Sequence, residues 1–274
     1  MEKVYVITGG GSGMGLATAK VIGDYGKVVL VGRNEKKLLQ AKKELDFYDM
    51  DVATFACDIS DKQSVEALAD FSQGLGKVQG VLHAAGMSPH MGEAETIMAA
   101  NALGTLHIHN AFIDVIEEGG CLIDVSSMSA YLTPKIVMPK RFYKMALLDE
   151  ELFKKKMLRW LQLFPKKVRS GVAYGISKHF VIWLAQQDAS RFGEKGIRVL
   201  SVTPGNFETP MGELEAEEAQ TYLKYNAIKR LGKVDEIAQL FAACLDERMG
   251  YLTGTDIVCD GGCIASGVGP FTRK

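Results

Sequence analysis

A tyrosine and a lysine four residues apart, Tyr174 and Lys178, form the clearest candidate for acid–base chemistry in this sequence. A spacing of four places both side chains on one face of a helix. A tyrosine hydroxyl with its ordinary pKa of about 10 is a poor catalyst at neutral pH. An ammonium close by favours the phenolate, so such a tyrosine can donate a proton to a carbonyl oxygen or remove one from an alcohol.

Two further pairs share this spacing: Tyr131/Lys135 and Tyr225/Lys229. The first contains a proline, which is unfavourable inside a helix. The second follows the sixth predicted strand, near the region expected to cover a substrate. Tyr174 opens a long apolar-periodic helical pattern just before that strand, and only this pair has a serine, Ser177, directly before its lysine. We therefore select Tyr174 and Lys178 and interpret the other two pairs as surface residues.

A glycine-rich loop directly after the first predicted strand is the second candidate site. It reads Thr8-Gly9-Gly10-Gly11-Ser12-Gly13-Met14-Gly15, and a helical pattern follows at once. Glycines let the backbone turn tightly and approach a pyrophosphate, while the amides at the helix start face the anion. The strand–loop–helix context predicts dinucleotide binding, and a glycine-rich turn without a ligand is the alternative.

The loop spacing, together with the Tyr174/Lys178 pair, resembles the short-chain dehydrogenase/reductase family over roughly residues 3–128 and 171–262. The resemblance implies an NAD(P)-dependent oxidoreductase that acts on CH–OH groups. It also implies that Tyr174 and Lys178 contact the cofactor. The loop residues that it assigns to cofactor binding are Thr8, Gly9, Gly11, Ser12, Gly13, Met14 and Gly15.

The family also has a catalytic serine after the fifth strand and an asparagine in the fourth helical region. Ser127 matches the serine, with Ser126 as the adjacent competitor and Ser129 as a weaker one. Asn101 matches the asparagine, whose backbone carbonyl in the family holds a water that links the lysine to solvent. A buried asparagine satisfied by helix backbone is the alternative. The implied catalytic set is Asn101, Ser127, Tyr174 and Lys178.

Further cofactor contacts implied by the resemblance are Asp58, Ala85, Gly86, Pro204, Gly205 and Thr209. Asp58 resembles the family's adenine contact, although a helix N-cap is a competing interpretation. The family's usual Asn-Asn-Ala-Gly is replaced by His83-Ala84-Ala85-Gly86. We interpret His83 as a structural residue at the strand end and not as the catalytic base. Asp260-Gly261-Gly262 resembles the family's turn after the last strand.

The end of the second strand bears on the choice between NADP and NAD. An NAD enzyme usually has a carboxylate there, whereas this chain has Gly32-Arg33. Arg33 can pair with a 2′-phosphate bidentately, and Ser12 can add a hydrogen bond. A solvated arginine at the start of the second helix is the alternative, and no second cation is evident. We expect NADP in preference to NAD.

The elements that must position these residues alternate between strands and helices. Seven Val/Ile-rich strands are predicted: Val4–Thr8, Val28–Val31, Val52–Ala56, Gly80–His83, Cys121–Val125, Ile197–Val202 and Asp256–Cys259. Amphipathic helices are predicted between them, including Met14–Tyr25, Glu35–Phe47, Lys62–Gln73 and Val234–Asp246. Continuous apolar strands imply burial on both faces. We predict one Rossmann-like domain over residues 1–274: a doubly wound parallel α/β sheet with helices on both faces.

Residues 129–171 interrupt this alternation and predict a helical insertion. Phe153, Met157, Trp160 and Phe164 recur at helical spacing and form one apolar face, with basic residues on much of the remainder. A similar insertion occurs in bacterial 3α-hydroxysteroid dehydrogenases of the family, where it contributes to subunit association. We expect it to cover the site or to mediate dimerisation; a surface helix packed on the domain is the alternative, and membrane-surface binding ranks last.

We therefore expect an oxidoreductase that interconverts a secondary alcohol and a ketone. Met87, Met91, Met138 and Met211, near the predicted pocket loops, favour a bulky apolar substrate such as a hydroxysteroid. The alternatives are a carrier-protein-linked ketoacyl reductase and a catalytically idle NAD(P)-binding regulatory or scaffold protein. Members of the family are commonly homodimers or homotetramers, and either is expected here.

Composition excludes several other classes. The formal charge of −1 argues against a nucleic-acid partner, and no apolar run is long enough to span a membrane. The five cysteines are scattered without a CxxC pair, so neither a disulfide framework nor a metal site is expected. The N-terminus shows no cleavable apolar segment. Together these features predict a cytoplasmic protein whose partners are a small-molecule substrate and copies of itself.

Overall fold

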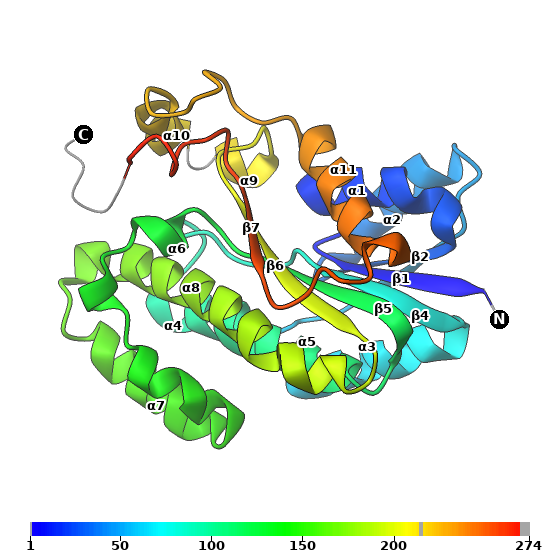
Figure 1. Ribbon diagram of the computed structural model, residues 1–274, viewed down its shortest axis with the longest axis horizontal. Helices are drawn as coiled ribbons and strands as arrows, with labels where there is room; N and C mark the ends of the chain where they lie inside the picture. The colour runs from blue at the N-terminus through cyan, green and yellow to red at the C-terminus, as the bar shows by residue number, and fades with distance from the viewer. Residues whose placement is uncertain (1, 214–215, 269–274) are drawn as a thin grey trace.

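The computed structural model describes residues 2–213 and 216–268 and contains one seven-stranded parallel sheet (Figure 1). The strand order is β3-β2-β1-β4-β5-β6-β7. The strands are β1 (Lys3–Thr8), β2 (Lys27–Gly32), β3 (Val52–Ala56), β4 (Lys77–His83), β5 (Ile116–Val125), β6 (Arg198–Pro204) and β7 (Asp256–Cys259). The predicted doubly wound, Rossmann-like sheet is confirmed.

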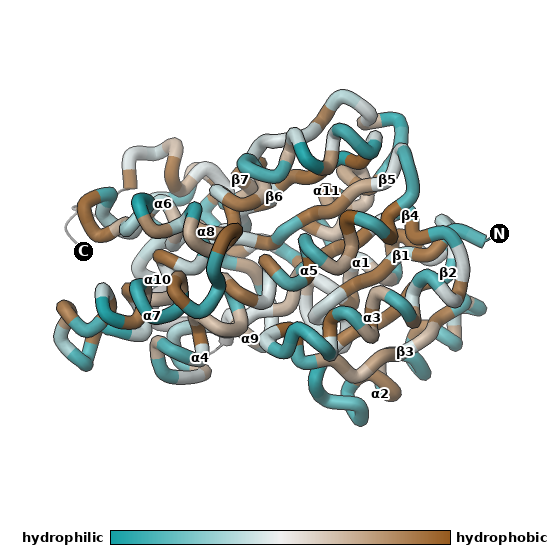
Figure 2. Tube along the Cα trace, turned by 90° about the horizontal axis from the view of Figure 1, so that it is seen from below, coloured by the Kyte–Doolittle hydropathy of each residue, from teal (hydrophilic) through white to brown (hydrophobic). Residues whose placement is uncertain are grey.

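Helices cover both faces of the sheet. On one face lie α1 (Gly13–Ile22), α2 (Glu35–Asp46) and α11 (Val234–Leu245), and on the other α3 (Lys62–Leu75), α5 (Gly104–Phe112) and α8 (Lys166–Gly193). A π-helical turn, η2 (Ala99–Leu103), joins α4 (Ala94–Met98) to α5. Because helices bury the sheet from both sides, its central strands are apolar along most of their length (Figure 2).

The order of the strands indicates where a ligand-binding crevice is expected. β1 has β2 on one side and β4 on the other, so the chain reverses its winding direction at β1. Loops at the carboxyl ends of β1 and β4 therefore diverge to opposite faces and leave a crevice between them. Open parallel sheets bind ligands at such a crevice.

The insertion folds as a helical subdomain against the helices of one face. It comprises α6 (Ser129–Leu132), η3 (Lys135–Val137), η4 (Lys140–Leu147) and α7 (Glu150–Leu161). Its last predicted residues instead form the start of α8, which begins at Lys166 after Pro165. Tyr174 therefore lies in the third turn of this helix and does not open it, because the basic residues before it continue the helix.

Helix α7 packs into the core. Phe153 and Met157 have no exposed surface, and they join residues of α4 and α8, such as Ile97 and Phe180, in one apolar cluster. The Trp160 indole donates to the carbonyl of Val137 at 2.9 Å, which ties α7 to η3. Of the expectations for the insertion, the alternative of a helix packed on the surface of the domain therefore describes α7.

A buried histidine anchors the start of α7. His107 of α5 contacts a carboxylate oxygen of Glu150 at 2.9 Å through Nε2, and its Nδ1 lies 3.1 Å from the carbonyl of Ile59.

Among the helices of the described residues, none has the length and apolar character needed to cross a membrane.

Replacing Phe153 by alanine tests whether α7 belongs to the core. The change removes a fully buried ring, so we expect a loss of about 3–5 kcal/mol in the free energy of unfolding. Urea unfolding followed by circular dichroism measures it. Leu163→Ala, at a side chain that is 72% exposed, is the control and should change this free energy by about 0.5 kcal/mol or less. Equal small losses for both variants would show that α7 is loosely attached.

Candidate active site

A cavity of about 880 Å³ opens at the carboxyl edge of the sheet, in the crevice between the β1 and β4 loops. The loops after β1 to β6 contribute to its wall, as do the middle of α8 and the chain after β6. Most of the residues selected from the sequence line this cavity: Thr8, Gly9, Ser12, Gly13, Met14, Gly15, Arg33, Asp58, Ala85, Gly86, Ser127, Tyr174, Lys178, Pro204, Gly205 and Thr209. Gly11 and Asn101 do not.

The glycine loop has the close backbone contacts that a dinucleotide requires. Gly9 has a φ of +72°, in the left-handed region that favours glycine. A Cβ at Gly15 would lie 2.5 Å from the carbonyl oxygen of Gly9, so this helix start can approach the loop only without a side chain. The amides of α1 then face the cavity, as a pyrophosphate needs. Gly11 lies against α2 instead, with Lys37 as a neighbour.

Arg33 and Asp58 line one end of the cavity. The Asp58 carboxylate accepts hydrogen bonds from the amide and hydroxyl of Ser60 at 2.9 and 2.7 Å. Burial raises the pKa of Asp58, but these hydrogen bonds and the charge of Arg33 outweigh it and hold this pKa below its ordinary value. The N-cap of α3 is Asp61, so the N-cap interpretation of Asp58 is wrong.

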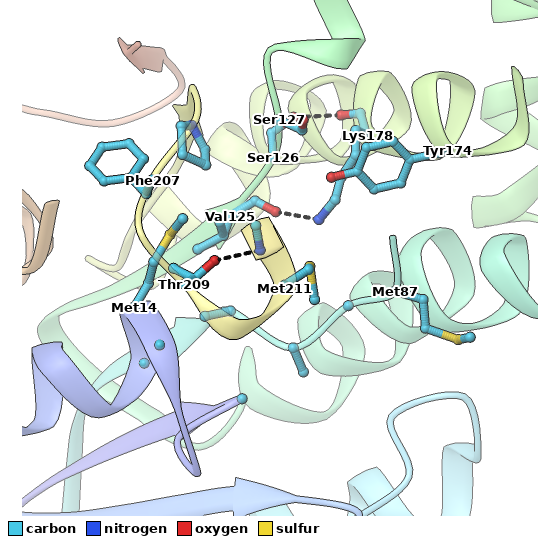
Figure 3. Close-up of a pocket in the computed structure, with 18 of the residues that line it drawn as sticks. Met14, Met87, Val125, Ser126, Ser127, Tyr174, Lys178, Phe207, Thr209 and Met211 are labelled. Atoms are coloured by element: carbon cyan, nitrogen blue, oxygen red, sulfur yellow. Dashed lines mark hydrogen bonds between the residues drawn. The ribbon is translucent and has the colours of Figure 1, made fainter. Parts of the chain in front are cut away.

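Tyr174 and Lys178 lie on one face of α8 and line the cavity together (Figure 3). The Lys178 ammonium donates to the carbonyl of Val125, the last residue of β5, at 2.8 Å. Both side chains are largely buried. Neither of the other two Tyr/Lys pairs lies on one helix. Tyr131 is in α6 and Lys135 in η3. Tyr225 and Lys229 follow α10 (Ala216–Leu223) in irregular structure.

The two serines after β5 have different partners. The Ser126 hydroxyl donates to the backbone carbonyl of Lys178 at 2.8 Å, so it fixes β5 to α8. Ser127 reaches the cavity wall, where its oxygen accepts a long hydrogen bond from the amide of Ser129. The Ser127 O–H is thereby available to a substrate oxygen, as the sequence assignment requires.

Asn101 lies behind the cavity in the π-helical turn and is 1% exposed. Its side chain clamps the backbone of Met87, accepting from the amide at 2.8 Å and donating to the carbonyl at 3.0 Å. It also donates to Ser177, whose hydroxyl donates to the carbonyl of Tyr174. The backbone carbonyl of Asn101 accepts from Thr105. Sequence reasoning missed this side-chain clamp, which joins the β4 loop to the catalytic helix.

Gly86 brings the β4 loop against the same helix. A Cβ at this position would lie 3.0 Å from the Asn101 Oδ1 and 3.3 Å from the Lys178 Nζ. His83, three residues earlier, is buried and does not line the cavity; Thr8 Oγ1 and His83 Nδ1 lie 2.9 Å apart. This contact agrees with the structural interpretation of His83.

The turn after β6 packs against the turn after β7. Gly205 lies so close to Asp260 that a Cβ would approach the latter's Cα to 2.7 Å. The Asp260 carboxylate accepts from the amides of Gly262 and Ile264. Thr209 lies close to Gly13, where a Cβ would be 3.6 Å from the Thr209 side chain, and its hydroxyl oxygen accepts from the amide of Gly212.

The other end of the cavity is mainly apolar, with side chains from α6, α9 (Pro210–Glu213) and α10. Its apolar lining includes Met87, Phe207 and Met211, which Figure 3 labels, together with Met128, Leu132 and Tyr222. Two of the four methionines noted in the sequence do not line it: Met138 is buried beside α7, and Met91 is 40% exposed. Of the predicted insertion, only residues at its two ends line this cavity: Ser129, Leu132, Thr133 and Gly171.

Comparisons with known proteins agree with this geometry. The family model described as "short chain dehydrogenase" matches residues 3–139, and the model "Enoyl-(Acyl carrier protein) reductase" matches residues 165–263. The chain is 32% identical over 271 residues to "Short-chain dehydrogenase/reductase bsc3" of Alternaria brassicicola, covering 96% of each protein. It is 25% identical to "Levodione reductase" of Leifsonia aquatica, covering 95% of this chain and 94% of that one.

Among solved structures, a short-chain type dehydrogenase/reductase from Mycobacterium ulcerans superposes with a TM-score of 0.78 at 25% identity, covering 96% of this chain and 90% of that one. The chain therefore belongs to the short-chain dehydrogenase/reductase family. It is an NAD(P)-dependent oxidoreductase, and the glycine loop supplies the close backbone approach that such a cofactor needs.

Gly86→Ala tests the tight contact between the β4 loop and the catalytic helix. The added methyl meets Lys178 and Asn101 with no room to spare, and overpacking costs about 1–3 kcal/mol. We expect NADPH binding, measured by fluorescence titration, to weaken by about tenfold. Gly193→Ala is the control, because a Cβ there has no neighbour within 4 Å. Equal affinities for both variants would contradict the contact.

Proposed function

We propose that this protein interconverts a secondary alcohol and a ketone by hydride transfer, with Tyr174 as the acid–base residue. The observation that carries this proposal is the convergence of Ser127, Tyr174 and Lys178 from two elements on one cavity wall, opposite the glycine loop. An idle regulatory protein would not need this arrangement.

Each of these side chains has a distinct task. Tyr174 Oη gives its proton to the carbonyl oxygen during reduction, or takes the proton of the alcohol during oxidation. The Lys178 ammonium, fixed by the Val125 carbonyl, favours the phenolate form of Tyr174. The Ser127 hydroxyl holds the reacting oxygen. When bound, the nicotinamide cofactor supplies or accepts the hydride, and the loops that contain Gly9, Gly86 and Thr209 would hold it.

Tyr174→Phe tests this assignment. Removing the hydroxyl should lower turnover of any accepted ketone by about 100-fold or more, because the proton transfer is lost, while NADPH still binds. NADPH oxidation followed by absorbance measures turnover. Tyr131→Phe, in the pair outside the cavity, is the matched control and should keep wild-type turnover. A Tyr174→Phe protein as fast as the wild type would show that the mechanism is wrong.

We also propose NADP as the preferred cofactor. Arg33 lines the cavity after β2, where Gly32 provides no carboxylate to repel a 2′-phosphate. We propose Lys37 as a second, weaker contact to the phosphate, which the sequence reasoning missed: it lies against Gly11 of the glycine loop, although neither residue lines the cavity. Its position in the first turn of α2, just after Arg33, was the available signal.

The ratio of kcat/KM for NADPH and NADH tests this preference. We expect Arg33→Ser to lower the ratio by about tenfold or more, because it removes a charge-assisted contact to the phosphate. Lys37→Ala should lower it less, and Lys43→Ala, on the same helix but away from the cavity, should leave it unchanged. A tenfold preference of the wild type for NADH would contradict the proposal.

For the substrate, we propose a bulky, uncharged and largely apolar ketone or alcohol, such as a hydroxysteroid. Support comes from the methionine-rich end of the cavity. Among the described side chains that line the cavity, the cationic ones are Arg33 and Lys178. We assign the first to the cofactor phosphate and the second to Tyr174, which leaves neither to bind an anionic substrate group. A carrier-linked thioester, whose prosthetic arm has a phosphate, finds less support. A panel of steroids, bile acids, sugars and aliphatic ketones distinguishes these substrate classes.

A further inference from the structure

A row of polar side chains crosses the sheet one residue before the catalytic edge. Strand register pairs Thr8 with His83, His83 with Asp124, Asp124 with Ser201, and Ser201 with Asp256. Paired residues of neighbouring parallel strands point to the same face, so five strands each contribute one member. The four members on β1, β4, β5 and β6 are at most 2% exposed.

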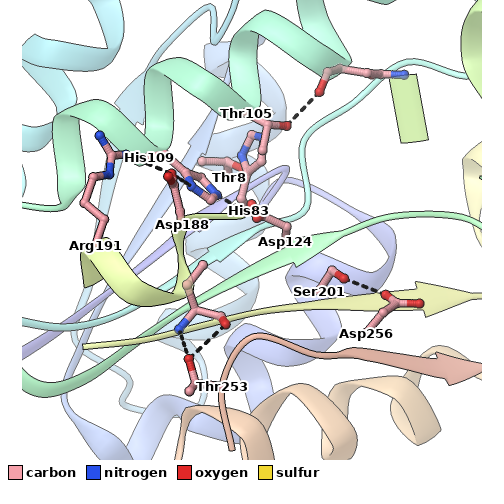
Figure 4. Close-up of polar contacts among 12 residues, drawn as sticks. Thr8, His83, Thr105, His109, Asp124, Asp188, Arg191, Ser201, Thr253 and Asp256 are labelled. Atoms are coloured by element: carbon pink, nitrogen blue, oxygen red, sulfur yellow. Dashed lines mark hydrogen bonds and ion pairs between the residues drawn. The ribbon is translucent and has the colours of Figure 1, made fainter. Parts of the chain in front are cut away.

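This row lies on the face covered by α5 and α8 (Figure 4). Asp124 Oδ2 lies 2.7 Å from the Nε2 of His109 on α5, and the Nδ1 of His109 lies 2.8 Å from Asp188 on α8. Asp188 also accepts from Arg191 at 2.8 Å, and the side chain of Arg191 is 40% exposed. A continuous set of polar contacts thus leads from the buried row to the surface.

Two side-chain atoms of this row have no hydrogen-bond partner. His83 Nε2 and Asp124 Oδ1 are both buried without a hydrogen-bond partner, on paired residues of adjacent strands. Leaving buried polar atoms unpaired costs about 1–3 kcal/mol each, so such atoms normally have a partner. Because the two residues are paired on adjacent strands, both side chains lie on the same face of the sheet, where one water molecule can join a donor to an acceptor.

The protonation of His83 follows from its other neighbour. The Thr8 hydroxyl oxygen accepts from the amide of Ala85 at 3.1 Å, which leaves the hydroxyl proton for the Nδ1 of His83. Burial, together with the charges of Lys178 and His109, lowers the pKa of His83 to about 3, so the ring is neutral. With Thr8 as the donor to Nδ1, the one proton of the neutral ring is on Nε2, the atom without a partner.

Several titratable groups lie close together beneath the site. Burial lowers the pKa of His109, but its two carboxylate neighbours outweigh burial and raise this pKa to about 9, so His109 is a cation at neutral pH. Burial, with a smaller contribution from the charge of Asp188, raises the pKa of Asp124 above its ordinary value, although the charges of His109 and Lys178 and the hydrogen bond from His109 oppose that rise. The titratable and charged groups near His83 and Asp124 on this face are Lys178, Asp188 and Arg191 on α8, His109 on α5 and Asp256 on β7.

We propose that His83 and Asp124 are positioning residues for the catalytic lysine: a buried water joins them, and the hydrogen bonds through it stabilise the anionic form of Asp124 beneath Lys178 against the effect of burial. This inference rests on the proposed function, in which the Lys178 ammonium sets the ionisation of Tyr174. Asp124 directly precedes Val125, whose carbonyl holds Lys178, so one short segment of β5 fixes both the position and the counter-charge of that lysine. His109, Asp188 and Arg191 balance the charge of Asp124 toward the surface.

Nuclear magnetic resonance of the full-length protein with bound NADP⁺ tests the proposal without a substrate. Tyrosine labelled with ¹³C at Cζ reports the pH at which Tyr174 loses its proton, and Tyr174→Phe identifies its signal. In His83→Leu the link is lost, so Lys178 is held less firmly as an ammonium and this pH should rise by about 0.5 unit or more. His83→Asn, which keeps a donor and an acceptor, should restore the wild-type value.

His107→Leu is the matched control, since it removes another buried histidine with two polar contacts on the same face of the sheet, away from the row. It should lower thermal stability and leave the ionisation of Tyr174 unchanged. An unchanged or lower value in His83→Leu, or an equal rise in His107→Leu, overturns the proposal. If Tyr174 of the wild type keeps its proton up to about pH 10, the proposed function fails instead.

A measurement on the wild type covers the case in which His83→Leu does not fold. Histidine rings labelled with ¹⁵N should show His83 neutral from pH 5 to 9, with its proton on Nε2 and a nuclear Overhauser contact from that proton to a bound water. A proton on Nδ1, or the lack of a water contact, overturns the proposal.

Discussion

The buried ammonium of Lys178 is the group around which the candidate site is assembled. A charged group can be buried only where polar partners replace water. The carbonyl of Val125 accepts from this ammonium, and the hydroxyl of Ser126 holds the lysine's own carbonyl, so β5 and α8 meet at fixed register. Gly86 brings the β4 loop to the same point because it lacks a side chain. Three elements thus depend on one lysine.

The interior of the sheet and its carboxyl end differ in polarity, and each contributes to the site in its own way. Deep in the sheet, apolar residues on both faces bury the strands between helix layers and provide rigidity. At its carboxyl end, the same face turns polar, from Thr8 on β1 to Asp256 on β7. A polar row is tolerated there because neighbouring strands and His109 of α5 supply hydrogen bonds to it. The catalytic edge therefore has an ordered polar layer directly beneath it.

The insertion shows why a local pattern predicts a helix better than it predicts the helix's neighbours. The spacing of Phe153 and Met157 correctly indicated one buried face. Nothing in that spacing distinguishes a face that covers a ligand from one that covers α4 and α8. The packing places α7 on the helices, and only the ends of the insertion reach the cavity. Its role in subunit association stays a prediction.

By itself, the sequence determined the sheet, the glycine loop and the Tyr174/Lys178 pair, because strand burial, tight turns and helical spacing are local properties of the chain. The tertiary structure decided which groups those residues meet. It separated Ser126, which binds a helix carbonyl, from Ser127, which faces the cavity, although the two are adjacent and chemically identical. It also paired His83 with Asp124, forty-one residues later, through strand register. Such contacts depend on how distant segments pack, and no local pattern encodes them.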